Sequence, residues 1–115
     1  MEIEGKVWGE TSLIFSKNNV EVHRIVGKLY GFSSKHKHEK KFNMFFVESG
    51  TLKISIWKDY GLLDETILEK GQSTVVPPGL FHQFNVIDGG TIAYEFYWTE
   101  IESNDIIREN VGGRK

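Results

Sequence analysis

Apolar and polar residues alternate in short runs along most of this chain. A period of two residues is typical of β-strands that bury one face. In residues 51–57, for example, Leu52, Ile54 and Ile56 fall on one face, and polar residues or a tryptophan fall on the other. The same pattern predicts strands at residues 11–15, 20–26, 43–48, 51–57, 65–69, 74–76, 80–86 and 91–99.

Turn-forming residues separate these runs at intervals of roughly 8 to 12 residues, as in sandwiches and barrels. Ser49 and Gly50 predict a tight hairpin turn. Pro78 and Gly79 suit the two central positions of a type II turn. No long stretch has helical periodicity, so the pattern predicts an all-β protein.

Length and composition predict one small globular domain. The 115 residues, 39% of them hydrophobic, can build one core over residues 1–115, with a disordered tail at about 110–115. Residues 103–108 could form a helical turn or an edge strand. The net charge of −2 argues against nucleic-acid binding. No apolar run approaches the roughly 20 residues that span a bilayer. Without cysteines or a secretory signal, we expect a cytoplasmic protein.

Three of the four histidines have the spacing of a metal site. His36 and His38 are two residues apart, so on a strand they point to the same side. His82, from a neighbouring strand, would complete a set of three imidazoles. Imidazole is the commonest protein ligand for zinc, iron, nickel and copper. We therefore predict a metal site at these histidines; the alternative is a relic triad that binds no metal.

The residues around these histidines resemble the two motifs of the cupin superfamily. The first motif, a His-x-His between two glycines, matches Gly31, His36, His38 and Gly50. The second matches Gly71, Pro77, Gly79, His82 and Asn85. The resemblance implies a double-stranded β-helix, or jelly-roll barrel, that holds a divalent metal ion such as Zn, Fe, Mn or Ni. Asn43 stands where the family usually has Glu, so the resemblance implies Asn43 as the fourth ligand.

Further stretches resemble the cupin domain of type II mannose-6-phosphate isomerases, namely residues 7–10, 22–25 and 104–108. This likeness implies a metal-dependent isomerase or epimerase that acts on a sugar or sugar phosphate through an enediol. The alternatives are a non-catalytic cupin that binds a carbohydrate or another small metabolite, and an iron-dependent dioxygenase. Cupins of this size commonly form dimers, so we expect a homodimer, with Trp8, Phe15 and Trp57 as candidate interface residues.

A general base is harder to find in the sequence. In residues 91–99, three aromatic residues share one face, and Glu95 and Tyr97 share the other. Only one of these faces can line the interior. Core packing is the default expectation for the aromatic residues, and a sugar-binding wall is the alternative. If Glu95 faces inward instead, it is the candidate catalytic base. We expect His23 to be a surface or hydrogen-bonded histidine, not a ligand.

Overall fold

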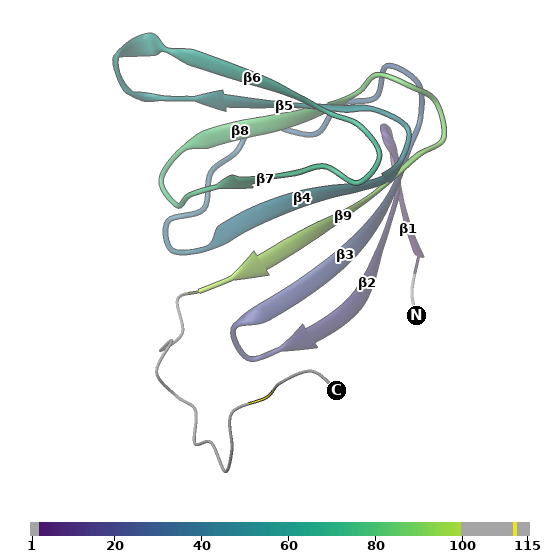
Figure 1. Cartoon of the computed structure of the whole chain (residues 1–115), viewed down its shortest axis with the longest axis horizontal. Coiled ribbons are helices and arrows are strands. Elements are labelled where there is room, and N and C mark those ends of the chain that lie inside the picture. The colour runs from purple at the N-terminus through teal and green to yellow at the C-terminus, as the bar shows by residue number, and fades with distance from the viewer. Residues whose placement is uncertain (1–2, 100–111, 113–115) are drawn as a thin grey trace.

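The computed structural model describes residues 3–99 and residue 112. Two antiparallel sheets face each other and splay apart at one end (Figure 1). This arrangement confirms the predicted all-β jelly-roll fold. The predictions for residues 103–108 and for the tail at 110–115 lie outside the described residues, apart from Gly112.

The larger sheet has six strands in the order β1-β2-β3-β9-β4-β7. Their bounds are Ile3–Lys6 for β1, Gly9–Lys17 for β2, Val20–Gly27 for β3, Phe42–Ser49 for β4, Ser73–Val76 for β7 and Thr91–Trp98 for β9. β3 pairs with β9 along its whole length, so a strand from the first part of the chain lies beside the last described strand.

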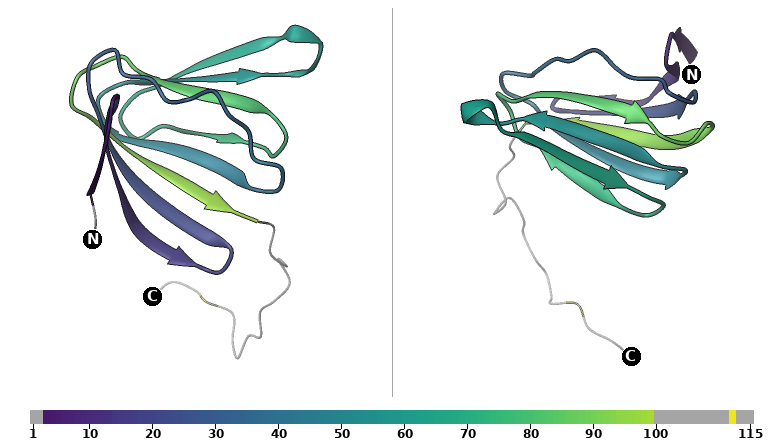
Figure 2. Two further views of the ribbon diagram at one scale, coloured as in Figure 1. Left: turned by 180° about the vertical axis from the view of Figure 1, so that it is seen from behind. Right: turned by 90° about the horizontal axis from the view of Figure 1, so that it is seen from above.

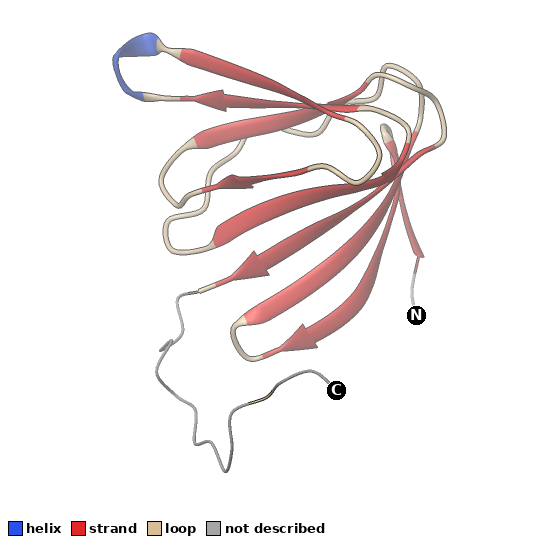
Figure 3. Cartoon of the chain, viewed as in Figure 1, coloured by secondary structure: helices blue, strands red, loops and turns tan. Residues whose placement is uncertain are grey.

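The smaller sheet has three strands in the order β6-β5-β8. Their bounds are Leu63–Leu68 for β6, Leu52–Trp57 for β5 and Phe81–Val86 for β8. A single 3-10 turn, Asp59–Gly61, joins β5 to β6 within the described residues (Figure 3). No helix in this described part of the chain is long and apolar enough to cross a membrane.

The alternating pattern located eight of the nine strands, with two departures. β1 was not predicted, because all four of its residues are exposed and its sequence has no buried face. β2 is longer than expected, and its register shifts between Leu13 and Phe15. A β-bulge of this kind places an extra residue in one strand and breaks the period of two.

The core fills the space between the two sheets. Its fully buried side chains come from both of them: Ile25, Phe45, Val47, Leu52, Ile54, Ile56, Leu68, Val76, Phe84, Val86 and Ala93. Each large aliphatic or aromatic side chain buried in this way contributes roughly 1.5–3 kcal/mol to folding. Trp8 also packs against this core, with its ring 4.9 Å from that of Phe84.

The inner face of the larger sheet changes from apolar to polar along its strands. Ile25 and Val47 lie in one row with Ala93 between them. Two residues further along, Glu95 stands between neighbours on β3 and β4, and Tyr97 follows in the next row. The site therefore forms at the polar end of the interior, next to a packed apolar core.

Residues 28–41 connect β3 to β4 and run along the free edge of β8 (Figure 2). They form no regular strand, only isolated bridges from Phe32 to Asn85 and from His36 to His82. His36 and His38 therefore share a site without belonging to a regular strand. Backbone hydrogen bonds still hold this segment against β8, and they decide where its histidines point.

Candidate metal centre

His36 and His82 face each other across a pair of backbone hydrogen bonds. The His36 amide donates to the His82 carbonyl at 3.1 Å, and the His82 amide donates to the His36 carbonyl at 2.8 Å. Directly opposed residues of an antiparallel pair project to the same side. The two rings accordingly lie 4.6 Å apart, and the His38 ring lies 5.1 Å from that of His36.

Hydrogen bonds to backbone carbonyls fix the orientation of two of these rings. His36 Nδ1 lies 3.0 Å from the Ser34 carbonyl, and His82 Nδ1 lies 3.1 Å from the Leu80 carbonyl. A carbonyl only accepts, so the tautomer that makes these two bonds carries its proton on Nδ1 and has its lone pair on Nε2. Hydrogen bonds of this kind orient histidine ligands in metal sites.

The three imidazoles form a group that could hold a metal ion. Their ligand atoms lie within 4.8 Å of one another, and His82 is only 1% exposed. Two buried polar atoms at the site, His38 Nε2 and Asn43 Oδ1, have no hydrogen-bond partner among the described residues. Such atoms are costly unless something else binds them. A divalent ion bound by imidazole nitrogens fits this donor set.

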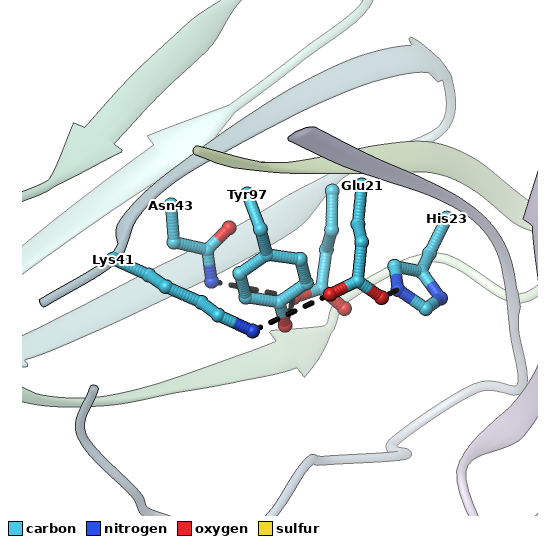
Figure 4. A network of polar contacts seen from close by, with 6 residues as sticks. Glu21, His23, Lys41, Asn43 and Tyr97 are labelled. Atoms are coloured by element: carbon cyan, nitrogen blue, oxygen red, sulfur yellow. Dashed lines mark hydrogen bonds and ion pairs between the residues drawn. The ribbon is translucent and has the colours of Figure 1, made fainter. Parts of the chain in front are cut away.

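The larger sheet contributes a second set of polar residues, several of which are drawn in Figure 4. The Asn43 amide lies 3.3 Å from His82 Nε2 and donates to Glu95 Oε2 at 3.3 Å. The Tyr97 hydroxyl donates to the same carboxylate oxygen at 2.5 Å. Both described hydrogen bonds of the Glu95 carboxyl therefore reach Oε2, which leaves Oε1 as the oxygen available to a ligand.

An ion-pair network continues from these residues along the inner face of β3. Glu21 lies 3.4 Å from His23 and 3.3 Å from Lys41, as Figure 4 shows. Burial alone would raise the pKa of Glu21, but Lys41 and His23 together hold that pKa below its ordinary value. His23, which we expected to be a surface or hydrogen-bonded histidine, contacts the Glu21 carboxylate.

A cavity of about 510 Å³ joins the two sets of residues. Its walls include His36 from the histidine group, and His23, Glu95 and Tyr97 from the larger sheet. Trp8 and Phe84 supply an aromatic wall, and residues of β1 form part of the rim. The cavity is large enough for a small polar metabolite.

Comparison with known proteins places this fold and site in a family. The sequence profile described as "Cupin domain" matches residues 30–99, which is more than half of the chain and includes all three histidines. The chain is a member of the cupin family. A search of curated protein sequences finds no match.

Solved structures of other cupins share the fold at low sequence identity. KdgF from a Halomonas species matches with a TM-score of 0.75 and 10% identity, over 88% of this chain and 90% of its own. A Bacillus subtilis oxalate decarboxylase, described by its Mn(II) centres, matches with a TM-score of 0.75 and 14% identity, over 91% of this chain and 29% of its own. The Cnp3 cupin domain of Schizosaccharomyces pombe matches with a TM-score of 0.73 and 10% identity, over 87% of this chain and 69% of its own.

Burial favours the neutral form of two of the three histidines, His82 and His38, by lowering their pKa values. It lowers the pKa of His82 to about 4, with a smaller contribution from the nearby His36 and His38, although the hydrogen bond to Leu80 opposes the change. Burial, followed by the nearness of His36 and Lys41, also lowers the pKa of His38. Neutral imidazole is the form that binds metals.

Burial acts in the opposite direction on the acidic groups across the cavity. It raises the pKa of Glu95, while hydrogen bonds from Tyr97 and Asn43 oppose that rise. It also raises the pKa of Tyr97, and the neighbouring Glu95 carboxylate adds to this effect. Tyr97 is therefore a hydrogen-bond donor at any ordinary pH. A carboxyl with a raised pKa inside a cavity is typical of a group that transfers protons.

The structure brings together every residue that the sequence singled out for the site. His36, His38 and His82 lie on the smaller sheet and the segment beside it, and Asn43 and Glu95 face them from the larger sheet. The expectation of core packing for the aromatic residues of β9 was wrong, because Tyr94, Phe96 and Trp98 lie on the outer face.

Tyr97 and Trp8 were not assigned to the site from the sequence. Tyr97 carries a usable signal, because it shares its strand face with Glu95 and must point inward whenever Glu95 does. Trp8 was named only as a candidate interface residue, and the structure places it beside Phe84, where it lines the cavity. No periodicity marks its role, because it lies in the turn between two strands.

Proposed function

We propose that this cupin is a metal-dependent isomerase or epimerase of sugars or sugar phosphates. The position of Glu95 carries the proposal: the residue is only 8% exposed, lies outside the histidine group, and lines the same cavity as His36. Interconversion of an aldose and a ketose requires polarisation of a carbonyl and transfer of the proton on the neighbouring carbon. The histidines would hold a metal ion for the first requirement, and Glu95 on the larger sheet would transfer the proton for the second.

A divalent ion held by the three imidazoles, when bound, supplies the Lewis acid that polarises the substrate carbonyl. Glu95 Oε1 takes the proton alpha to that carbonyl, which leaves an enediolate. The proton of the neighbouring hydroxyl then moves to the former carbonyl oxygen, and Glu95 returns its own proton to the adjacent carbon. Tyr97 and Asn43 donate to Oε2, so Oε1 receives no described hydrogen bond and is the oxygen to which we assign the proton transfer. Tyr97 is in this scheme a positioning residue for Glu95.

The shape of the cavity also supports a carbohydrate ligand. Trp8 and Phe84 form an aromatic wall, and the apolar face of a sugar packs well on such a surface. Ser33, Ser34 and Thr11 add polar groups around it. The sequence likeness to the cupin domain of type II mannose-6-phosphate isomerases, in residues 7–10, includes this tryptophan.

The test is exchange of the substrate's alpha proton with solvent deuterium, followed by NMR. Metal-loaded protein is incubated in heavy water with a panel of aldoses, ketoses and their phosphates. We expect exchange by the wild type and at least a roughly 100-fold loss in Glu95→Gln, since general bases contribute about 10²–10⁴-fold. Glu65→Gln, an exposed carboxyl that pairs with Lys53 on the smaller sheet, is the matched control. No exchange with any member of the panel would reject the proposal.

One contact favours a second candidate, a cupin that binds a small metabolite without turnover. The Asn43 amide nitrogen lies 3.3 Å from His82 Nε2, the atom whose lone pair a metal requires. Elemental analysis of untagged protein, wild type against His36→Ala, separates the two candidates. A stoichiometric metal that is lost in the variant supports the enzyme, and a metal-free wild type after reloading supports the binding protein. Iron(II)-dependent oxygen uptake would instead support the dioxygenase alternative.

A further inference from the structure

The proposed isomerisation moves two protons, and Glu95 accounts for only one of them. Glu95 carries the proton that passes from carbon to carbon. The proton of the neighbouring hydroxyl must also reach the former carbonyl oxygen, and a positioned acid–base group accelerates such a transfer by about 10²–10⁴-fold. Because the two oxygens are bonded to the two reacting carbons, this second group must stand beside Glu95 in the cavity.

His23 stands in that position. Backbone register sets it directly opposite Glu95 on the neighbouring strand β3. Opposed residues of an antiparallel pair project to the same side, with their Cβ atoms about 4.5–5.5 Å apart. Both residues line the cavity of about 510 Å³ together with His36. The His23 ring also packs edge-on against Tyr97, with 5.6 Å between the ring centres.

Glu21 holds one nitrogen of the His23 imidazole and leaves the other available. Glu21 Oε1 lies 3.4 Å from His23 Nε2, and Glu21 Oε2 accepts from Lys41 at 3.3 Å (Figure 4). A carboxylate only accepts, so this contact favours the tautomer with the proton on Nε2 and the lone pair on Nδ1. The ring hydrogen bonds of histidines among the described residues belong to His36 and His82, so none of them occupies Nδ1 of His23.

The charge of Glu21 suits a histidine that is protonated during part of a reaction. Burial would raise the pKa of Glu21, but Lys41 and His23 outweigh that effect and hold the pKa below its ordinary value. The carboxylate is therefore ionised at neutral pH. A carboxylate beside an imidazole orients the ring and stabilises the imidazolium that forms when the ring takes a proton.

The other titratable groups around the cavity are less suited to this transfer. Burial and the neighbouring carboxylate raise the pKa of Tyr97, so its hydroxyl keeps its proton. His36 belongs to the histidine group, and Lys6 at the rim is paired with Glu4 at 3.0 Å. Among the described residues that line the cavity, His23 is therefore the one imidazole outside the histidine group.

We propose that His23 is the second acid–base residue of this site, a role that rests on the proposed isomerase function. Its Nδ1 takes the proton of the substrate hydroxyl as that O–H bond breaks, and the same nitrogen then gives the proton to the former carbonyl oxygen, where a new O–H bond forms. The electron pair left on the hydroxyl oxygen forms the new carbonyl bond, and the electrons of the carbon–carbon double bond take the proton that Glu95 returns. Glu21 is a positioning residue for His23.

Two readings from one incubation in heavy water test this role, with the same panel of sugars and sugar phosphates. Deuterium in the recovered substrate reports on Glu95 alone, whereas formation of the isomer requires both residues. We expect His23→Gln to retain most of the exchange and to lower the ratio of isomer formed to deuterium incorporated by about 100-fold or more. Glu21→Gln should lower the same ratio by a smaller factor. Arg24→Gln, at the next residue on β3 and on the opposite face of the sheet, is the matched control and should leave the ratio unchanged.

The outcomes separate this proposal from the isomerase function on which it rests. No exchange by the wild type would reject the isomerase and the role of His23 with it. Exchange by the wild type with an unchanged ratio in His23→Gln would reject the role of His23 alone, because a residue that only supports the fold affects both readings alike. Circular dichroism confirms that each variant is folded.

NMR of ¹⁵N-labelled histidine in the metal-free protein at alkaline pH gives a second test that needs no substrate. We expect the His23 signals, identified by their absence in His23→Gln, to show the proton on Nε2. This is the opposite of the tautomer that the backbone carbonyls favour at His36 and His82. A proton on Nδ1 would overturn the proposal, because that nitrogen would then have no lone pair for the hydroxyl proton.

Discussion

Glu95 differs from an ordinary surface glutamate because its environment distinguishes its two oxygens. Tyr97 and Asn43 donate to Oε2, whereas Oε1 receives no described hydrogen bond, and the residue lines the cavity. Burial raises the pKa of this carboxyl and the two donors oppose the rise. The balance between burial and the two hydrogen bonds sets the pH at which Glu95 loses its proton and can act as a base.

Replacing Tyr97 by Phe should raise the pKa of Glu95, because one of the hydrogen bonds that stabilise the carboxylate is lost while the burial remains. Infrared spectroscopy of the protonated carboxyl band against pH measures the change without a substrate. The Glu95→Gln variant identifies the band. Tyr94→Phe, on the outer face of the same strand, is the matched control and should leave the titration unchanged. An unchanged titration in Tyr97→Phe would show that the hydroxyl does not hold the carboxylate.

His82 should make the metal-free protein less stable as the pH falls. Its pKa is about 4 in the folded protein, against 6.5 for an unperturbed histidine, so the unfolded state binds more protons between these values. The stability that depends on neutral His82 is complete above pH 6.5 and is lost as the pH falls toward about 4. The full effect is on the order of 3 kcal/mol.

Urea unfolding of the metal-free protein at several pH values between 4 and 7 measures this dependence. Wild-type stability should fall with pH across this range, and the slope should be smaller in His82→Gln. Equal slopes in the two proteins would contradict the prediction, whatever their absolute stabilities.

At the scale of the elements, the hairpin between β4 and β5 depends on a glycine. Gly50 has a φ of +89°, and a Cβ on it would lie 2.8 Å from the Cα of Thr91. Gly90 has a similar φ of +77° with open space around its Cβ position. Comparing alanine substitutions at these two glycines therefore distinguishes the cost of the backbone conformation, which both share, from the cost of a steric clash, which only Gly50 has.

Gly90→Ala should destabilise the protein by about 1–2 kcal/mol, the cost of the left-handed conformation for a residue with a side chain. Gly50→Ala should cost at least about 1 kcal/mol more, because the turn must also move away from β9. Chemical denaturation of both variants and the wild type gives the comparison. Equal losses in the two variants would mean that the hairpin adjusts to the methyl group freely.

The strands were predictable from sequence wherever one face is buried and the other is not. β4, β5 and β8 fit this description, and the predicted bounds lie within one residue of those observed. β1 has no buried face, and the bulge in β2 interrupts the period. For β9 the pattern could not decide the inward face, because it carries aromatic side chains on both sides.

The residues of the site could be predicted from the sequence, but their contacts with one another could not. The spacing of His36, His38 and His82 indicated a shared site without giving the register that sets His36 opposite His82. That register comes from backbone hydrogen bonds between segments more than forty residues apart in the sequence. The association of Glu95 with Tyr97 and Asn43 likewise requires the order of strands in the larger sheet.

At the scale of the whole molecule, the two sheets carry different parts of the site. The three histidines belong to β8 and the segment beside it, and the carboxyl with its donors belongs to β4 and β9. Metal bound by the histidines alone should therefore stiffen one side of the barrel.

Hydrogen exchange followed by mass spectrometry should show this asymmetry. Adding Zn²⁺ or Mn²⁺ should slow amide exchange in residues 31–41 and in β8, because the ion links those two segments, and should leave β3 and β9 unchanged. Slower exchange in β4 as well would show that Asn43 completes the metal site. His36→Ala should abolish the effect in every segment. Uniform slowing across both sheets would contradict the division of the site.

This division has a consequence for how such a protein can be altered. The groups that would choose the metal and those that would move the proton lie on separate sheets, joined mainly by the apolar core between them. A substitution that adapts the histidines to another ion leaves the hydrogen bond from Tyr97 to Glu95 in place, whereas Asn43, which contacts both His82 and Glu95, couples the two sheets. In a library of variants, changes on the two sheets should therefore combine almost independently as long as Asn43 is kept, so each half can be optimised in its own round of selection.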